Sequence, residues 1–163
     1  MNSQIKQKIS LVRLVAIIVS LIVFIKPGLM FSQESHKSPN LGKLTVIITG
    51  FTNETGNCRF ALDNSKFVYE REDTVWIGKV LPIVNKQVIV VIDSLQYGEY
   101  AVRVFHDENK NEIVDTNILG IPTEDYGYSN NVSSWFGPPS WDRAKFIFDK
   151  TEMTIEIEVG SFI

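Results

Sequence analysis

Apolar and polar residues alternate along the chain from Lys43 onward. Leu44, Val46 and Ile48 alternate with Thr45 and Thr49, which predicts a strand with one buried face. Similar apolar patterns predict further strands over residues 58–62, 75–83, 87–92, 100–104, 143–148 and 153–159. The run 87–92 is continuously apolar, which is typical of a strand buried on both faces. Turn-forming residues separate these segments, and none has a convincing helical period.

Seven short strands with turns between them predict an all-β domain, namely an antiparallel seven-stranded β-sandwich with one long ordered loop. The loop is the segment 106–141, which is rich in Asn, Asp, Gly, Pro and Ser and lacks a clear period. Loops of this length are usually functional or disordered. Aromatic residues in this segment favour an ordered loop.

The aromatic residues of the loop are candidates for ligand binding. They are Tyr126, Tyr128, Trp135, Phe136 and Trp141. Their rings could stack on a glycan or a peptide, or they could bury against the sandwich and anchor the loop. Anchoring is favoured, because aromatic side chains supply most of the packing energy available to a loop.

The first 42 residues do not share the alternating pattern. Lys6, Lys8 and Arg13 precede an uncharged apolar run over residues 14–25, and polar residues follow. This order is that of a secretory signal peptide, and the run is shorter than the ~20 residues of a membrane span. We predict a signal peptide over residues 1–32, a linker over 33–42 and one domain over 43–163. An uncleaved anchor is the alternative, and the chain would then contact a membrane through that segment.

Charge and cysteine content exclude several classes of function. Removal of residues 1–32 would leave twelve basic and nineteen acidic residues, a net charge of −7. Such a surface repels phosphate backbones, so nucleic acid is excluded as a partner. Cys58 is the single cysteine of the sequence, so no intrachain disulfide can form, and we expect it to be a small buried hydrophobic residue. An exported monomer, periplasmic or at the cell surface, is expected.

An acidic loop follows the predicted strand 100–104. Oxygen-bearing side chains recur at positions 107, 109 and 111 and again at 115. Calcium takes six to eight oxygen ligands, and alternate spacing lets a curled loop point them at one centre. The predicted calcium ligands are the side chains of Asp107, Asn109, Asn111 and Asp115 and the backbone carbonyl of Ile113, with Glu124 closing the site.

The acidic loop departs from the EF-hand pattern. Glu112 stands where a glycine is expected for the sharp turn, and Ile118 stands where an EF-hand has a bidentate glutamate. No helices are predicted on either side. We therefore expect modest calcium affinity, of the kind that suits extracellular concentrations. A solvated Asn/Asp turn is the alternative.

His106 raises the alternative of a small periplasmic hydrolase, in which it would act with Asp107 or Asp115. The sequence contains no evident nucleophile for it, and no Ser-His-Asp or zinc set. A histidine at a strand end on the domain surface is the simpler expectation.

A long ordered series of motifs resembles a known family. The series comprises Gly98 to Asn111, Asp115-Thr-Asn, Leu119-Gly-Ile-Pro, Glu124, Tyr126-Gly-Tyr-Ser-Asn-Asn and Phe136-Gly-Pro-Pro. These motifs resemble DUF2141, a family of exported bacterial proteins of unknown function, and the resemblance covers roughly residues 43–160. The family usually has Asn-Gly where this chain has Asn111-Glu112.

The resemblance implies an architecture similar to immunoglobulin-like, transthyretin-like and carboxypeptidase-regulatory-like sandwiches. It also implies an acidic loop like those of calcium-bearing B-type repeats in surface adhesins. We expect an exported, non-enzymatic binding or structural module with a calcium-stabilised loop. The alternatives are the hydrolase and a surface adhesion module that binds glycans or peptides through the aromatic residues of 126–141. The sequence identifies no particular ligand or partner.

Overall fold

The computed structural model describes residues 40–71, 73–133 and 137–160. The predicted signal peptide and most of the predicted linker lie outside the described residues. The strands are β1 (Leu41–Thr49), β2 (Asn57–Asp63), β3 (Ile77–Leu81), β4 (Val88–Gln96), β5 (Gly98–Asp107), β6 (Tyr126–Tyr128), β7 (Phe146–Phe148) and β8 (Glu152–Glu158). Short helices are α2 (Lys66–Tyr69), α3 (Trp141–Ala144) and the 3-10 turn η1 (Ser129–Asn131). Within these ranges no helix has the length and hydropathy needed to cross a bilayer.

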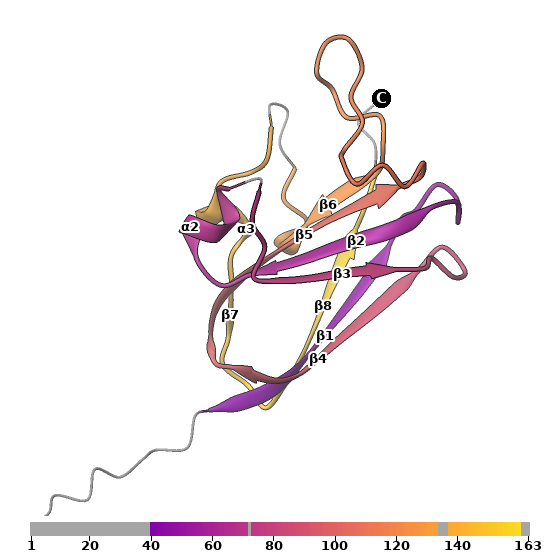
Figure 1. Ribbon diagram of the computed structural model, residues 1–163. Helices are drawn as coiled ribbons and strands as arrows, with labels where there is room; N and C mark the ends of the chain where they lie inside the picture. Colours follow the sequence, from indigo (N-terminus) through magenta and orange to yellow (C-terminus); the bar gives the residue numbers. More distant parts are fainter. Residues whose placement is uncertain (1–39, 72, 134–136, 161–163) are drawn as a thin grey trace, which may run out of the picture. The chain divides into compact units, whose positions relative to one another are not determined.

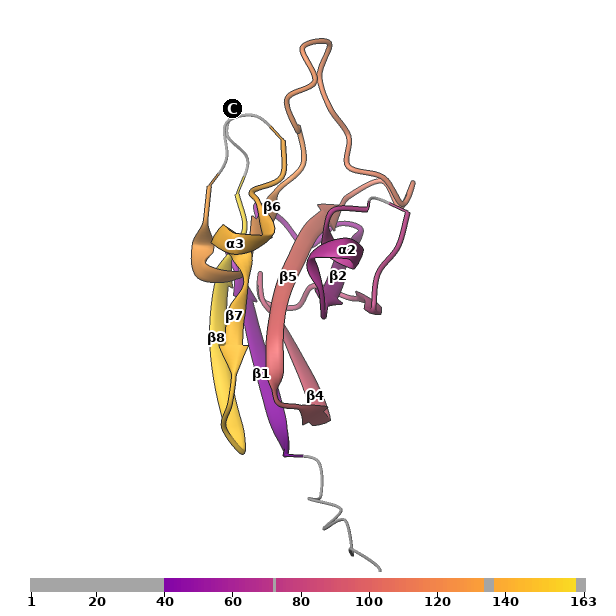
Figure 2. The same cartoon turned by 90° about the vertical axis from the view of Figure 1, so that its left-hand side faces the viewer.

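The strands form two sheets (Figures 1 and 2). The smaller sheet has the order β4-β1-β8, with β1 antiparallel to β4 and parallel to β8. The larger sheet has the order β3-β2-β5-β6, and β7 pairs with β5 further along the same strand. The predicted all-β class is confirmed, but the expectation that the strands are all antiparallel is wrong, because β1 and β8 pair in parallel. The described part of the chain contains eight strands rather than seven, because the long loop contributes β6.

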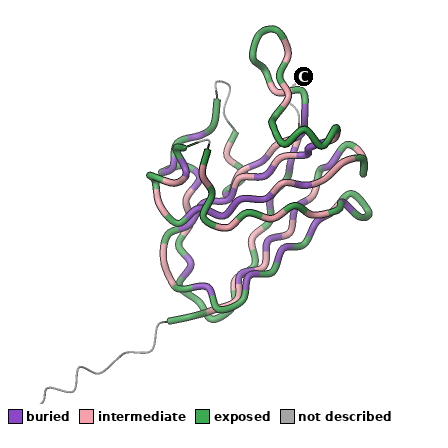
Figure 3. The backbone as a smooth tube through the Cα atoms, viewed as in Figure 1, coloured by how far each residue is buried: buried purple, intermediate pink, exposed green. Residues whose placement is uncertain are grey.

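One hydrophobic core lies between the inner faces of the two sheets. Leu44, Val46 and Ile48 of β1 are fully buried, as their alternation predicts. Figure 3 shows buried stretches alternating with more exposed ones along the strands. Side chains of β2 and β5, among them Leu62 and Val102, complete the same core. Cys58 lies in it as expected, and burial raises the pKa of its thiol to about 12.

Two sequence expectations are wrong. The run 87–92 is not buried on both faces, since Ile89 is 56% and Val91 is 42% exposed on β4. An apolar run cannot show whether the outer face of its sheet is covered, and β4 is an edge strand with a bare outer face. Residues 143–148 do not form one strand. Helix α3 covers 141–144 and β7 follows it, because Trp141 and Ala144 pack into a second cluster.

The second cluster lies around α2, α3 and β5, apart from the main core. Its buried members are Tyr69, Ala101, Trp141 and Ala144. The Tyr69 hydroxyl also donates a hydrogen bond to the Pro139 carbonyl over 2.9 Å. This cluster fixes the C-terminal part of the long loop, which carries the candidate binding residues, onto the larger sheet.

Candidate functional site in the acidic loop

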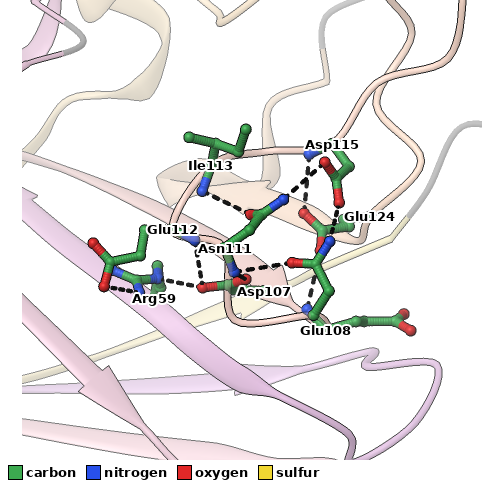
Figure 4. A network of polar contacts seen from close by, with 9 residues as sticks. Arg59, Asp107, Glu108, Asn111, Glu112, Ile113, Asp115 and Glu124 are labelled. Carbon is green, nitrogen blue, oxygen red and sulfur yellow. Dashed lines mark hydrogen bonds and ion pairs between the residues drawn. The ribbon is translucent and has the colours of Figure 1, made fainter.

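The acidic loop, residues 107–125, joins β5 to β6 (Figure 1). Asp107 ends β5, and its side chain is fully buried. The Nε atom of Arg59, on β2, donates to Asp107 Oδ2 over 2.6 Å, and the backbone N–H groups of Asn111 and Glu112 donate over 3.0 and 3.2 Å (Figure 4). Burial opposes ionisation of this carboxyl, but these hydrogen bonds outweigh it and hold the pKa of Asp107 below its usual value.

Asn109 and Asn111 each accept a hydrogen bond from a backbone N–H group two residues further along the chain. Asn109 Oδ1 accepts from the Asn111 N–H over 2.9 Å, and Asn111 Oδ1 accepts from the Ile113 N–H over 3.0 Å. Their amide nitrogens both donate to the Asp115 carboxylate, over 2.5 and 3.0 Å. Short-range bonds of this type produce the curl that the alternate spacing predicts. These bonds bring Asn109 together with Asp107, Asn111 and Asp115, and Figure 4 shows the last three side by side.

Glu124 closes the loop from the β6 side. Its side chain is buried, with 5% exposure of the residue. Its two oxygens accept from the N–H groups of Glu108 and Asp115 over 3.0 and 3.1 Å (Figure 4). The side chain of Ile113 is exposed, so the backbone is what this residue can contribute to a site. The predicted ligand residues therefore lie in one turn of chain closed by Glu124.

The arrangement of the carboxylates does not form a ready metal site. Among the described residues, no group of three or more His, Cys, Asp or Glu side chains is placed to hold a metal ion. The carboxylates of Asp107, Asp115 and Glu124 accept hydrogen bonds from N–H donors instead. The donor set fits calcium chemically, since carboxylate, amide and backbone oxygens are its usual ligands. Ligation would require the amide oxygens of Asn109 and Asn111 to turn toward Asp115.

Glu112 occupies the position where a glycine was expected. Its φ is +74°, in the left-handed region, and Lys110 has φ +61°. The turn is therefore made with a non-glycine residue, at a cost of roughly 1–2 kcal/mol. The Glu112 side chain pairs with Nη2 of Arg59 over 3.0 Å (Figure 4). Because that side chain is 74% exposed, the ion pair stabilises the loop little.

His106 is buried, and the expectation that it lies at the surface is wrong. Its Nε2 lies 2.5 Å from the Thr55 carbonyl, and the Phe51 ring contacts the imidazole edge-on with centroids 5.4 Å apart. The segment between β1 and β2 thus covers a residue that the sequence places at a strand end. Nδ1 has no hydrogen-bond partner among the described residues; carboxylate oxygens of Glu108 and Asp125 lie 3.7 and 3.8 Å away.

The three aromatic candidates that lie within the described residues do not share one surface. Tyr126 and Tyr128 are half-buried on β6, with ring centroids 5.9 Å apart. Trp141 is 5% exposed and packs against Tyr69, with centroids 5.8 Å apart. Trp135 and Phe136 lie outside the described residues. Trp141 therefore anchors the loop instead of facing a ligand.

Sequence reasoning missed the structural role of Ser129, Asn130 and Asn131. The Asn130 amide nitrogen donates to three carbonyls in and after α3, those of Arg143, Ala144 and Lys145, over 3.0, 3.1 and 2.9 Å. Asn130 and Asn131 have φ of +62° and +49°. Asparagine tolerates this conformation and readily binds backbone groups, so the Asn-Asn pair was a usable signal.

The neighbours of Asn130 attach the same turn to two more elements. Ser129 Oγ accepts from the Val102 N–H over 2.9 Å and donates to the Ala144 carbonyl over 2.5 Å. The Asn131 side chain accepts from the Glu158 N–H over 2.8 Å and donates to the Glu156 carbonyl over 3.3 Å. This turn joins β5, α3 and β8, and it holds the far end of the long loop.

Comparison with known proteins identifies a family. A family model described as "Uncharacterized protein conserved in bacteria (DUF2141)" matches residues 46–156. No curated protein and no solved structure matches the chain.

Proposed function

The chain belongs to the DUF2141 family, and on that premise we propose that it is an exported, non-enzymatic binding or structural module whose acidic loop binds calcium. The family description names no activity, so the proposal depends on the loop. We assign the fold more finely as an immunoglobulin- or transthyretin-like sandwich, supported by two sheets that share one core. The predicted signal peptide over residues 1–32 is the reason to infer a periplasmic or cell-surface location.

One observation carries the calcium proposal. The amides of Asn109 and Asn111 both donate to Asp115, while Asp107 at the start of the loop has a lowered pKa. Rotation of both amides would exchange nitrogen for oxygen and remove the donors of the Asp115 carboxylate. A calcium ion is the partner that would then stabilise those oxygens. Calcium would act as a clasp that holds the loop closed, and the loss of two backbone hydrogen bonds would keep the affinity modest.

We propose no catalytic role for His106. It has no exposed surface, and the Asp107 carboxylate faces Arg59 instead of the imidazole. The nearest carboxylate oxygens lie beyond hydrogen-bond reach of Nδ1. Similarly, burial of Trp141 removes one of the rings that a glycan- or peptide-binding surface would use.

Calcium titration of the melting temperature tests the proposal. With a dissociation constant of roughly 0.1–1 mM, typical of extracellular modules, about 10 mM calcium should stabilise the fold by ~1–3 kcal/mol. The melting temperature should rise by about 5–10 °C. Asp115→Asn should abolish the rise, because it removes a charge without removing the loop.

Asp142→Asn is the matched control, since Asp142 is an exposed acidic residue on α3 outside the acidic loop. It should keep the full calcium response. A wild-type melting temperature that calcium leaves unchanged, together with no calcium in native mass spectra, would contradict the proposal.

A further inference from the structure

The tip of the acidic loop is an apolar finger, defined here as residues 116–123. It projects beyond the ends of β5 and β6 (Figures 1 and 2), and exposed residues predominate in it (Figure 3). Ile118 is 102% and Leu119 is 78% exposed, and the finger contains no charged residue. Two neighbouring aliphatic side chains at this exposure, on a projecting uncharged loop, form a candidate contact surface.

The finger is held by its own hydrogen bonds. Thr116 and Pro122 form a bridge between its two sides, and the Asn117 N–H donates to the Ile121 carbonyl over 2.8 Å. The Gly120 N–H donates to the Asn117 carbonyl over 2.9 Å. Asn117 Oδ1 then accepts from the N–H groups of Leu119 and Ile121 over 2.9 and 3.1 Å.

These hydrogen bonds lower the energetic cost of burying the finger away from water. The backbone N–H groups of residues 117, 119, 120 and 121 are all paired inside the finger, and Pro122 has none to pair. Loss of water from the tip therefore leaves few backbone donors unsatisfied. Because the shape is already fixed, binding would cost little ordering of the loop.

The base of the finger is acidic. Residues 107–125 contain six acidic residues and one lysine, a net charge of −5. The side chains of Glu108 and Glu112 are 40% and 74% exposed there. A surface that receives the finger would meet this negative charge around the apolar tip, so basic residues around an apolar centre would complement it.

The same features disfavour two other binding partners for the finger, a lipid bilayer and a second copy of the chain. A bilayer is disfavoured because the exposed side chains of Ile118, Leu119 and Ile121 together contain fewer carbon atoms than a single myristoyl chain, which alone binds membranes marginally. The finger also lacks the Trp, Tyr, Lys or Arg residues that anchor a segment among lipid headgroups. A symmetric contact with a second copy would place the two negatively charged loops against each other, and like charges repel.

We propose that the apolar finger inserts Ile118 and Leu119 into an apolar pocket with a basic rim on a partner protein. This inference rests on the proposed role as a binding module, and it does not require calcium. The residues of the acidic loop on either side of the finger, Glu124 among them, would hold the finger in its projecting position.

Photo-crosslinking from the finger in the native cell tests this proposal. A benzophenone amino acid replaces Thr116, an exposed residue beside the tip, in the full chain. The crosslinked peptide of the partner should contain apolar residues with Lys or Arg around them. Binding of the purified partner, measured by calorimetry, should weaken about 30-fold or more in the Ile118→Ser/Leu119→Ser variant.

The matched control is Ile89→Ser/Val91→Ser, which removes another exposed aliphatic pair, on the outer face of β4. The control should bind the partner as the wild type does. Crosslinks to lipid or to a second copy, no crosslinked product, or equal loss of binding in the control would overturn the inference. The Ile118→Ser/Leu119→Ser variant should keep the melting temperature and the calcium response of the wild type. A wild-type protein that does not respond to calcium would therefore contradict the proposed calcium site, but not the proposed binding of a partner by the finger.

Discussion

Substitution of Glu112 by glycine and by alanine measures the backbone strain in the acidic loop. Both changes remove the exposed ion pair with Arg59, so that loss cancels when the two variants are compared. Alanine keeps the cost of a side chain at φ +74°, roughly 1–2 kcal/mol, and glycine relieves it. Glycine adds about 0.4–1 kcal/mol of chain entropy in the unfolded state. The glycine variant should therefore be the more stable of the two by about 1 kcal/mol.

Urea denaturation followed by circular dichroism measures this difference. The same pair of substitutions at Glu70 is the control, since Glu70 has φ −80° at the end of α2. Alanine should be the more stable residue there, because glycine gains no relief from strain. An alanine variant at position 112 as stable as the glycine variant would refute the assignment of a strained turn.

Two further predictions concern the ends of the long loop. Asp107→Asn should lower the free energy of unfolding by about 2–3 kcal/mol at pH 7, less than a fully buried pair would lose because Arg59 is 21% exposed. Since the folded pKa of Asp107 is lowered, its stabilisation is present above about pH 4 and is lost as the pH falls through the folded pKa. The free energies of unfolding of the wild type and the variant should therefore converge as the pH is lowered. A difference between them that stays constant with pH would contradict this assignment. Asn130→Ala should lose about 2 kcal/mol in urea denaturation, because three carbonyls lose a donor and alanine is strained at φ +62°. Asn130→Gly should lose less, and equal losses would contradict the contribution of the backbone.

The sequence predicts the strands well wherever one face of a sheet is buried and the other is not. Alternation identified Leu44, Val46 and Ile48 as core residues, because the side chains of a strand point alternately to opposite faces. It failed on β4, where exposed Ile89 and Val91 have the same apolar character as their buried neighbours. Which face of a sheet is covered is a tertiary property and leaves no mark in such a run.

The candidate site was predictable in part. The spacing of Asp107, Asn109, Asn111 and Asp115 predicted a curled loop, because Asn and Asp side chains bind backbone groups a few residues ahead. The partners of the loop were not predictable. Arg59 lies 48 positions before Asp107 and meets it because β2 pairs with β5. The burial of His106 likewise depends on the distant segment around Phe51 and Thr55.

The parallel pairing of β1 with β8 has a consequence for how the protein folds. The first and last strands of the described residues are neighbours in the smaller sheet, with Leu44 opposite Met153 and Ile48 opposite Ile157. Pairs so far apart in sequence form slowly, since the entropy of closing a chain-length loop is lost before the contact is gained. A chain that ends before β8 leaves one side of β1 unpaired. The smaller sheet should therefore stay incomplete until β8 has been synthesised, and a nascent chain should complete its fold only near the end of synthesis.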